Sequence, residues 1–182
     1  MDGNRFNPNK VLTDPYTLAV HRPHDWSLGS AASGPDRTDH TVAAAAKSVI
    51  VESDFVWSEA EAAWRAARAS DTHEGHQWED LVVYETHVKG FTQNPMSGVE
   101  HPGTYLGLGE KADYLQDLGV NAVELLPIHQ KEGLTGGYWG YSNLSYFVLE
   151  SSYSANYQAT GRADTTIDEF KQMVQTLHEH DI

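Results

Sequence analysis

Apolar positions follow a regular pattern only in the second half of the chain, from Leu81 onward. The run Leu81–Tyr84 is short, apolar and rich in strand-forming residues, which is typical of a strand buried on both faces of a parallel sheet. A second apolar run, Val120–Leu126, is closed by Pro127, whose missing N–H would interrupt a continuing strand. The pattern therefore predicts two buried parallel strands.

Each predicted strand is followed by a helical pattern. One apolar stripe has the spacing i, i+4, i+7 and i+10, ends at Gly119 as the left-handed C-cap, and comprises Leu108, Ala112, Leu115 and Leu118. Thr166 and Glu169 have the spacing of a capping box that opens another helix, with a stripe made of Ile167, Phe170, Val174 and Leu177. Alternation of strand and helix predicts an α/β fold with right-handed crossovers. Because a (β/α)8 barrel needs eight such units and about 250 residues, we expect the chain to be part of a larger protein.

Residues 1–80 show little sustained periodicity, and we place a boundary between two regions near residue 80. The stretch Ser27–Thr41 is rich in Gly, Ser, Ala and Asp, which favours a loop. Lys47–Val51 fits a short strand, whereas Ser58–Ala69 fits either a helix or an Ala-rich linker.

The charge of the chain limits its partners. Its 182 residues contain 12 Lys+Arg and 26 Asp+Glu, which gives a formal net charge of −14 at pH 7. Such a surface repels phosphate backbones and anionic lipid headgroups, so we expect no nucleic acid and no membrane as partner. No window approaches the roughly 20 consecutive apolar residues of a spanning helix, and the first residues lack the apolar region of a signal peptide. These features slightly favour a cytoplasmic location.

Catalytic groups in α/β folds gather at the carboxyl ends of the strands, here after Tyr84 and after Leu126. Glu85 and His87 lie two residues apart and would share one face of the strand if it extends that far. Two interpretations are open: a catalytic or substrate-binding pair, or a hydrogen-bonded strand end. His129, just beyond the second strand, has the same two interpretations.

The segment after the second strand carries Gly-Tyr-Trp-Gly-Tyr, residues 137–141. Tyr138, Trp139 and Tyr141 offer flat aromatic faces on a backbone that can bend sharply, and sugar rings pack their apolar C–H faces on such platforms. The alternative is that these aromatics fill a small core of their own loop. We take the three residues as candidate substrate-binding residues.

Other features argue against a complete catalytic or metal site. The sequence shows no convincing pair of carboxylates of the kind that glycoside hydrolysis needs. We expect four other acids to lie on helix surfaces or at helix caps: Asp113, Asp117, Asp168 and Glu169. His178 and His180 are two residues apart and face different directions on a helix. Because Cys is absent, thiolate catalysis and Cys-ligated metals are excluded. We expect no metal and no cofactor.

Four sequence segments carry a family resemblance: Tyr84–Thr92, Gly103–Gly107, Leu118–Pro127 and Tyr138–Tyr141. They occur in the same order in the isoamylases and glycogen-debranching enzymes of the α-amylase superfamily, which the chain resembles. The tail strings 153–156 and 168–174 resemble the bacterial isoamylase branch. Upstream, 5–10 and 14–16 resemble the segment that joins the family's starch-binding-like β-sandwich to its barrel. The chain departs from the family at His101, where Arg is usual, and at Gly136–Gly137, where Asn is common.

This resemblance implies a (β/α)8 TIM barrel of which residues 81–182 would be the first two βα units, with residues 1–80 as linker and end of the β-sandwich-like region. It implies hydrolysis of α-1,6-glucosidic branch points in glycogen or amylopectin-like glucans. The family's catalytic Asp, Glu and second Asp would lie beyond Ile182, so the chain alone would hold no catalytic residue and be inactive. Tyr141 matches the aromatic that stacks under the sugar, and Trp139 matches a neighbour in the same cleft. The alternatives are a non-catalytic glucan-binding module and a nonfunctional remnant.

Overall fold

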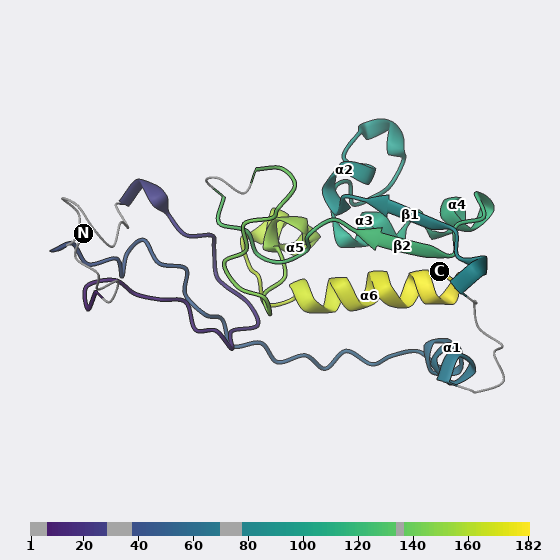
Figure 1. Cartoon of the computed structure of the whole chain (residues 1–182), viewed down its shortest axis with the longest axis horizontal. Helices are drawn as coiled ribbons and strands as arrows, with labels where there is room; N and C mark the ends of the chain where they lie inside the picture. The colour runs from purple at the N-terminus through teal and green to yellow at the C-terminus, as the bar shows by residue number, and fades with distance from the viewer. Residues whose placement is uncertain (1–6, 29–37, 70–77, 134–136) are drawn as a thin grey trace.

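The computed structural model describes residues 7–28, 38–69, 78–133 and 137–182. Figure 1 shows an elongated molecule in which the helices and strands after residue 80 gather on one side. The described part of the N-terminal region extends away from them and then returns along the molecule to place helix α1 beside α6. The regular elements are α1 (Glu59–Ala69), β1 (Val83–Thr86), α2 (Val88–Thr92), α3 (Tyr105–Gly109), α4 (Ala112–Asp117), β2 (Ala122–Leu125), α5 (Ala155–Thr160) and α6 (Thr166–Glu179). Short 3-10 helices are η1 (Trp26–Leu28), η3 (Trp78–Asp80), η4 (Pro95–Ser97) and η5 (Ser151–Tyr153).

The two strands pair in parallel, as the sequence predicted, with Val83 opposite Ala122 and Thr86 opposite Leu125. Burial on both faces, however, is wrong. On one face Tyr84, Val123 and Leu125 pack on the core, whereas Val83 on the other face is 53% exposed. The reason is that helices cover a single face of the two described strands.

The predicted single stripe over residues 108–118 is divided between two short helices, α3 and α4. Leu108, Ala112 and Leu115 are buried as predicted, but Leu118 is 54% exposed. Between the two helices, the carboxylate of Glu110 accepts hydrogen bonds from the backbone N–H groups of residues 100 and 101. Gly119 has φ +84°, the left-handed conformation predicted for the C-cap.

Helix α6 is confirmed, but the capping box at its start is wrong. The N-cap position is Thr165, whose side chain makes no capping hydrogen bond. Glu169 is buried instead of lying on a helix surface or capping its own helix. Its carboxylate accepts hydrogen bonds from Ser154 Oγ at 2.7 Å, Ala155 N at 2.6 Å and Asn156 N at 2.9 Å. Glu169 therefore satisfies the open N–H groups at the start of α5.

The N-terminal predictions have mixed outcomes. Residues 59–69 are a helix and not a linker. Lys47–Val51 forms no strand and contributes one isolated antiparallel bridge, between Val20 and Ser48. Most of the predicted loop Ser27–Thr41 lies outside the described residues.

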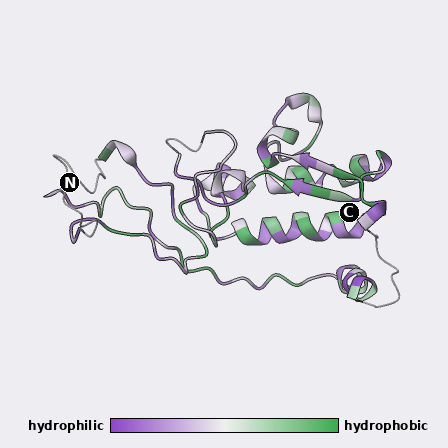
Figure 2. Cartoon of the chain, in the orientation of Figure 1, coloured by the Kyte–Doolittle hydropathy of each residue, from purple (hydrophilic) through white to green (hydrophobic). Residues whose placement is uncertain are grey.

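The main core lies between the sheet and the helices α3, α4 and α6. Figure 2 shows hydrophobic positions alternating with hydrophilic ones along α6, as an amphipathic helix requires. The buried members of this core are Val88, Tyr105, Leu108, Ala112, Leu115, Val120, Tyr153, Met173, Leu177 and Ile182. This packing leaves the carboxyl ends of β1 and β2 open to the segments that follow them.

Candidate functional site

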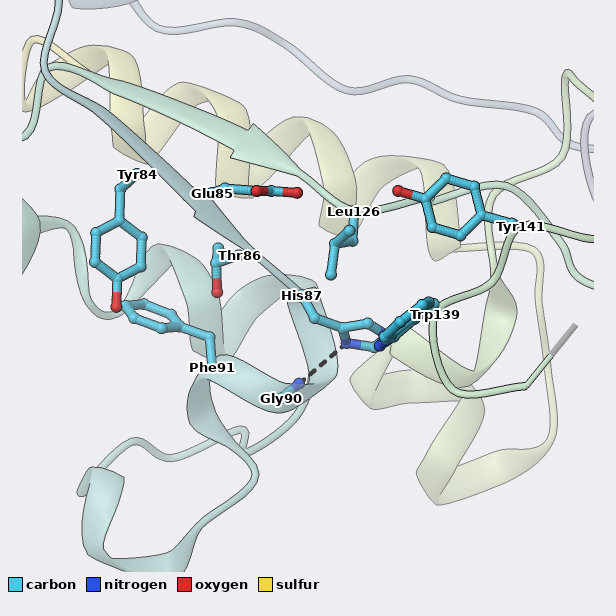
Figure 3. Close-up of a pocket in the computed structure, with 9 residues that line it drawn as sticks. All are labelled: Tyr84, Glu85, Thr86, His87, Gly90, Phe91, Leu126, Trp139 and Tyr141. Carbon is cyan, nitrogen blue, oxygen red and sulfur yellow. Dashed lines mark hydrogen bonds between the residues drawn. The ribbon is translucent and has the colours of Figure 1, made fainter.

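A cleft of about 1070 Å³ lies at the carboxyl ends of the two strands (Figure 3). Its walls come from the end of β1, the start of α2, Leu126 after β2, and the side chains of Trp139 and Tyr141. Figure 3 shows Glu85 on one side of Leu126 and Tyr141 on the other. The cleft therefore occupies the place where parallel α/β folds carry their chemistry.

Residues 137–142, which we call the aromatic loop, lead into the second arm of a hairpin whose described arms are residues 128–133 and 142–150. Backbone hydrogen bonds close its base: Gln130 N donates to Val148 O at 2.7 Å, and Leu144 N donates to Gln130 O at 2.8 Å. Nearer the loop, Glu132 N donates to Ser142 O at 2.9 Å. The N-terminal region adds a support, because Trp26 Nε1 donates to Glu132 O at 2.7 Å.

A buried polar cluster strengthens the base of the hairpin. Glu150 Oε2 accepts hydrogen bonds from Gln130 Nε2 and Lys131 N, both at 3.0 Å. Gln130 Oε1 in turn accepts from Ser151 N at 3.3 Å and Ser151 Oγ at 3.1 Å. All three side chains in this cluster, Glu150, Gln130 and Ser151, are buried. Because buried polar groups are costly when unpaired, this satisfied cluster favours one geometry for the hairpin.

The three candidate aromatics do not fill a core of their own loop. Tyr138 is 53% exposed, and Trp139 and Tyr141 are each 66% exposed. Trp139 and Tyr141 line the cleft. Tyr138 differs, because its ring stacks on that of His87 with 4.0 Å between centroids and 13° between planes.

Glu85 and His87 do not share a strand face. The strand ends at Thr86, and His87 is the N-cap of α2. Its Nδ1 accepts hydrogen bonds from Lys89 N and Gly90 N, both at 3.1 Å. Glu85 is exposed in the cleft, whereas His87 is buried, so the ring is bonded within the protein as the non-catalytic interpretation expected.

The second nitrogen of His87 joins the aromatic loop to the core. Nε2 lies 2.7 Å from Tyr138 O and 3.0 Å from the Tyr153 hydroxyl. Burial lowers the pKa of His87, the Tyr138 carbonyl opposes this, and the positive charges of Lys131 and Lys89 lower the pKa further. Burial likewise raises the pKa of Tyr153, with a contribution from Glu150, so this phenol stays protonated.

The other histidines that the sequence singled out, His129, His178 and His180, do not line the cleft. His129 is half-buried and meets Tyr146 edge to face, at 6.1 Å between ring centroids. His178 and His180 diverge as predicted: the first bonds Glu61 at 2.7 Å and the second Asp113 at 2.9 Å.

The described ranges contain neither a metal-binding cluster nor a membrane-spanning helix. Within residues 7–28, 38–69, 78–133 and 137–182, no group of three His, Asp or Glu side chains is placed to hold a metal ion. No helix in those ranges is both long and apolar enough to cross a membrane.

Sequence reasoning missed the buried acids Glu61, Glu150 and Glu169. It also missed the contacts that His87 and Gly90 make with the ring of Tyr138. Each of these contacts joins residues that are far apart in sequence, so local spacing carries no signal for them. The one usable signal was Gly90 in the segment after the first predicted strand, since glycine often marks a close approach of another group.

The chain was compared with known proteins. No protein-family model matches it. The glycogen debranching enzyme of Yersinia enterocolitica is 35% identical over 191 residues, which is 97% of this chain and 26% of the relative. The isoamylase of Pseudomonas amyloderamosa is also 35% identical, over 97% of this chain and 23% of the relative. The chain thus spans about a quarter of the length of these curated relatives.

Solved structures show the same fold. Pullulanase type I from Bacillus subtilis, crystallised with maltose, superposes with a TM-score of 0.62 at 24% identity, over 93% of this chain and 22% of the pullulanase. The small parallel sheet with its helices agrees with part of the TIM barrel of such enzymes. Along almost its whole length, the chain is therefore homologous to one segment of the isoamylases and glycogen-debranching enzymes.

Proposed function

We propose that this chain forms one wall of the substrate cleft in a glycoside hydrolase that cleaves α-1,6-glucosidic branch points of glycogen or amylopectin-like glucans. The observation that carries the proposal is the exposed aromatic loop, which a firmly closed hairpin presents at a cleft of about 1070 Å³. The debranching enzymes and isoamylases among the relatives support the substrate class, and the pullulanase of Bacillus subtilis adds maltose as a bound sugar.

In this proposal Tyr141 stacks under a glucose ring, and Trp139 and Tyr138 extend the platform. Exposed aromatic faces suit sugars because they bury C–H groups while the phenol and indole edges remain available to hydroxyls. Water released from the faces of ring and sugar provides the driving force. The cleft at the end of two parallel strands is where the substrate of an α/β barrel binds.

The hydrolytic chemistry is proposed to come from outside these residues. Retaining glycoside hydrolysis needs two carboxyl groups about 5 Å apart, one as nucleophile and one as acid and base. Of the described residues that line the cleft, Glu85 alone carries a carboxylate. We therefore place the catalytic Asp, Glu and second Asp on segments beyond Ile182, and assign no catalytic residue to this chain.

Residues 1–80 are proposed to be the linker and the end of a β-sandwich-like region. Their described part is held by scattered antiparallel contacts, among them His21 N to Lys47 O at 3.0 Å and Val49 N to Ala19 O at 2.9 Å. Such contacts resemble the margin of a sheet whose other strands lie elsewhere.

A non-catalytic glucan-binding module is the second candidate, because the platform is present while a carboxylate pair is absent from the described cleft. The two candidates differ in what the platform is used for, and both predict binding. A nonfunctional remnant would bind no glucan.

Binding is tested by titrating the chain with maltotetraose and following tryptophan fluorescence. We expect a saturable change that Trp139→Ala abolishes and Trp78→Ala preserves, since Trp78 is 89% exposed and lies outside the cleft. Cellotetraose should produce a weaker change. A response that persists in Trp139→Ala, or no response in the wild type, would count against the platform.

Catalysis is tested separately with amylopectin. The chain alone is expected to release no new reducing ends, because a binding platform without the carboxylates provides no chemistry. Turnover that disappears in Glu85→Gln would show instead that the chain carries a catalytic group of its own.

A further inference from the structure

Tyr138 is fixed at both its backbone and its ring, unlike its neighbours in the aromatic loop. Its carbonyl oxygen lies 2.7 Å from His87 Nε2, and its ring stacks on the imidazole. The far end of the ring reaches Gly90, where a Cβ atom would overlap the Tyr138 hydroxyl. His87 and Gly90, one turn of α2 apart, thus form a seat for Tyr138.

The hydrogen bonds define the protonation state of His87. Nδ1 accepts from the N–H groups of Lys89 and Gly90, so it carries no proton. A neutral imidazole with a bare Nδ1 has its proton on Nε2, which therefore donates to the Tyr138 carbonyl. The Tyr153 hydroxyl oxygen, 3.0 Å away, lies within reach of the same proton.

We propose that His87, as the neutral Nε2–H imidazole, is the positioning residue that holds the aromatic loop over the cleft. Protonation of Nδ1 would end its capping of α2, move the ring out of the seat for Tyr138, and so weaken glucan binding. The glucan part of this inference rests on the proposed function. The positioning part rests on the contacts alone.

Protonation conflicts with the seat because a proton on Nδ1 would face two backbone N–H donors. It would also place a positive charge at the start of a helix, where the backbone already presents partial positive charge. The charged groups around the ring add to this conflict: Lys89 comes from α2 and Lys131 from the hairpin, both cationic. Tyr153 of η5 stays neutral, and Glu85 of β1 has its carboxylate exposed in the cleft.

The decisive variant is His87→Asn. Asparagine is a good N-cap and keeps an acceptor for the N–H groups that open α2, but it is too short to replace the ring under Tyr138. We expect the melting temperature to stay near that of the wild type. The heteronuclear NOE of the Trp139 indole should fall, because the loop loses its anchor, and maltotetraose should bind about 3- to 10-fold more weakly, as expected for one lost hydrogen bond.

The pH profile separates positioning from a merely structural role. In the wild type, lowering the pH from about 7.5 to well below the ordinary imidazole pKa of about 6.5 should protonate the ring and reproduce both effects of His87→Asn. In His87→Asn the same pH change should leave the loop and the binding unchanged. His40→Asn is the matched control, since His40 is exposed, and it should retain the wild-type profile.

Gly90→Ala tests the ring end of the seat. Alanine favours the helix but collides with the Tyr138 hydroxyl, so the expected result is a displaced Tyr138 with α2 intact.

A His87→Asn protein with wild-type loop order and wild-type pH profile would overturn the inference. If the wild type fails to bind maltotetraose while loop order still depends on His87, the proposed function fails and the positioning role stands.

Discussion

Single side chains in the aromatic loop have sharply different surroundings although they are close in sequence. Tyr138 is held by His87, whereas Tyr141 contacts the open cleft and is 66% exposed. A residue that the protein holds by hydrogen bond and ring contact orients the loop, and one that is exposed in the cleft is available for a ligand. The two tyrosines should therefore respond differently to truncation.

Tyr141→Ala is expected to weaken maltotetraose binding by about 1 to 3 kcal/mol, or roughly 5- to 150-fold, through lost contact area and ring stacking. Its melting temperature should remain near the wild-type value, because the side chain contributes little to the core. Fluorescence titration and a thermal melt measure the two effects. A collapse of stability with unchanged binding per folded molecule would make Tyr141 a structural residue.

Among the secondary-structure elements, sequence patterns correctly predicted those features that depend on neighbouring residues alone. The strands, the helix α6 and the left-handed Gly119 follow from propensity and spacing, and all are present. Glu169 shows the limit: its spacing from Thr166 indicated a cap of its own helix, but its carboxylate binds the start of α5. Which N–H groups lie nearest depends on how α5 and α6 pack, and one segment's sequence does not contain that information. For the same reason, the sequence predicted that the cleft lies at the ends of the strands, but it did not predict that His87 and Gly90 contact Tyr138.

Glu169→Ala should lower the free energy of unfolding by about 1.5 to 3 kcal/mol, because it leaves buried donors at the start of α5 without their charged acceptor. Urea denaturation measures the loss. Asp117→Ala, at an exposed position of α4, is the control and should change stability little. Equal effects of the two substitutions would contradict the cross-helix cap.

Helix α1 is joined to α6 by a buried acid. Glu61 is fully buried and bonds Arg65 Nε at 2.5 Å and His178 Nδ1 at 2.7 Å. The ring of Trp64 also stacks on His178, with 3.6 Å between centroids. Glu61→Gln should raise hydrogen exchange across α1 while leaving the centre of α6 protected, since this buried joint links α1 to α6. Uniform exchange changes in both helices would argue against a local joint.

For the whole molecule, stability should decline in acid in two stages. Burial lowers the pKa of His21, His24 and His87 below the usual 6.5, so each is neutral in the folded state while the unfolded chain binds protons. By linkage, the free energy of unfolding is fully retained above about pH 6.5 and falls as the pH decreases. A second loss should follow at lower pH, because hydrogen bonds to Ser27 and Arg162 lower the pKa of Asp25 and Asp164. Urea midpoints across this range measure both stages, and a flat profile between pH 7 and 5 would contradict the first.

The hairpin formed by residues 128–133 and 142–150 has a further consequence. The contacts that close it involve Gln130, Glu150 and backbone groups, whereas Trp139 and Tyr141 take no part in them. Substitutions at these two positions therefore change the surface offered to a sugar without loosening its support. Evolution can vary ligand preference here at little cost in folding, and a mutant library confined to residues 139 and 141 should yield mostly well-folded proteins with altered selectivity for glucans.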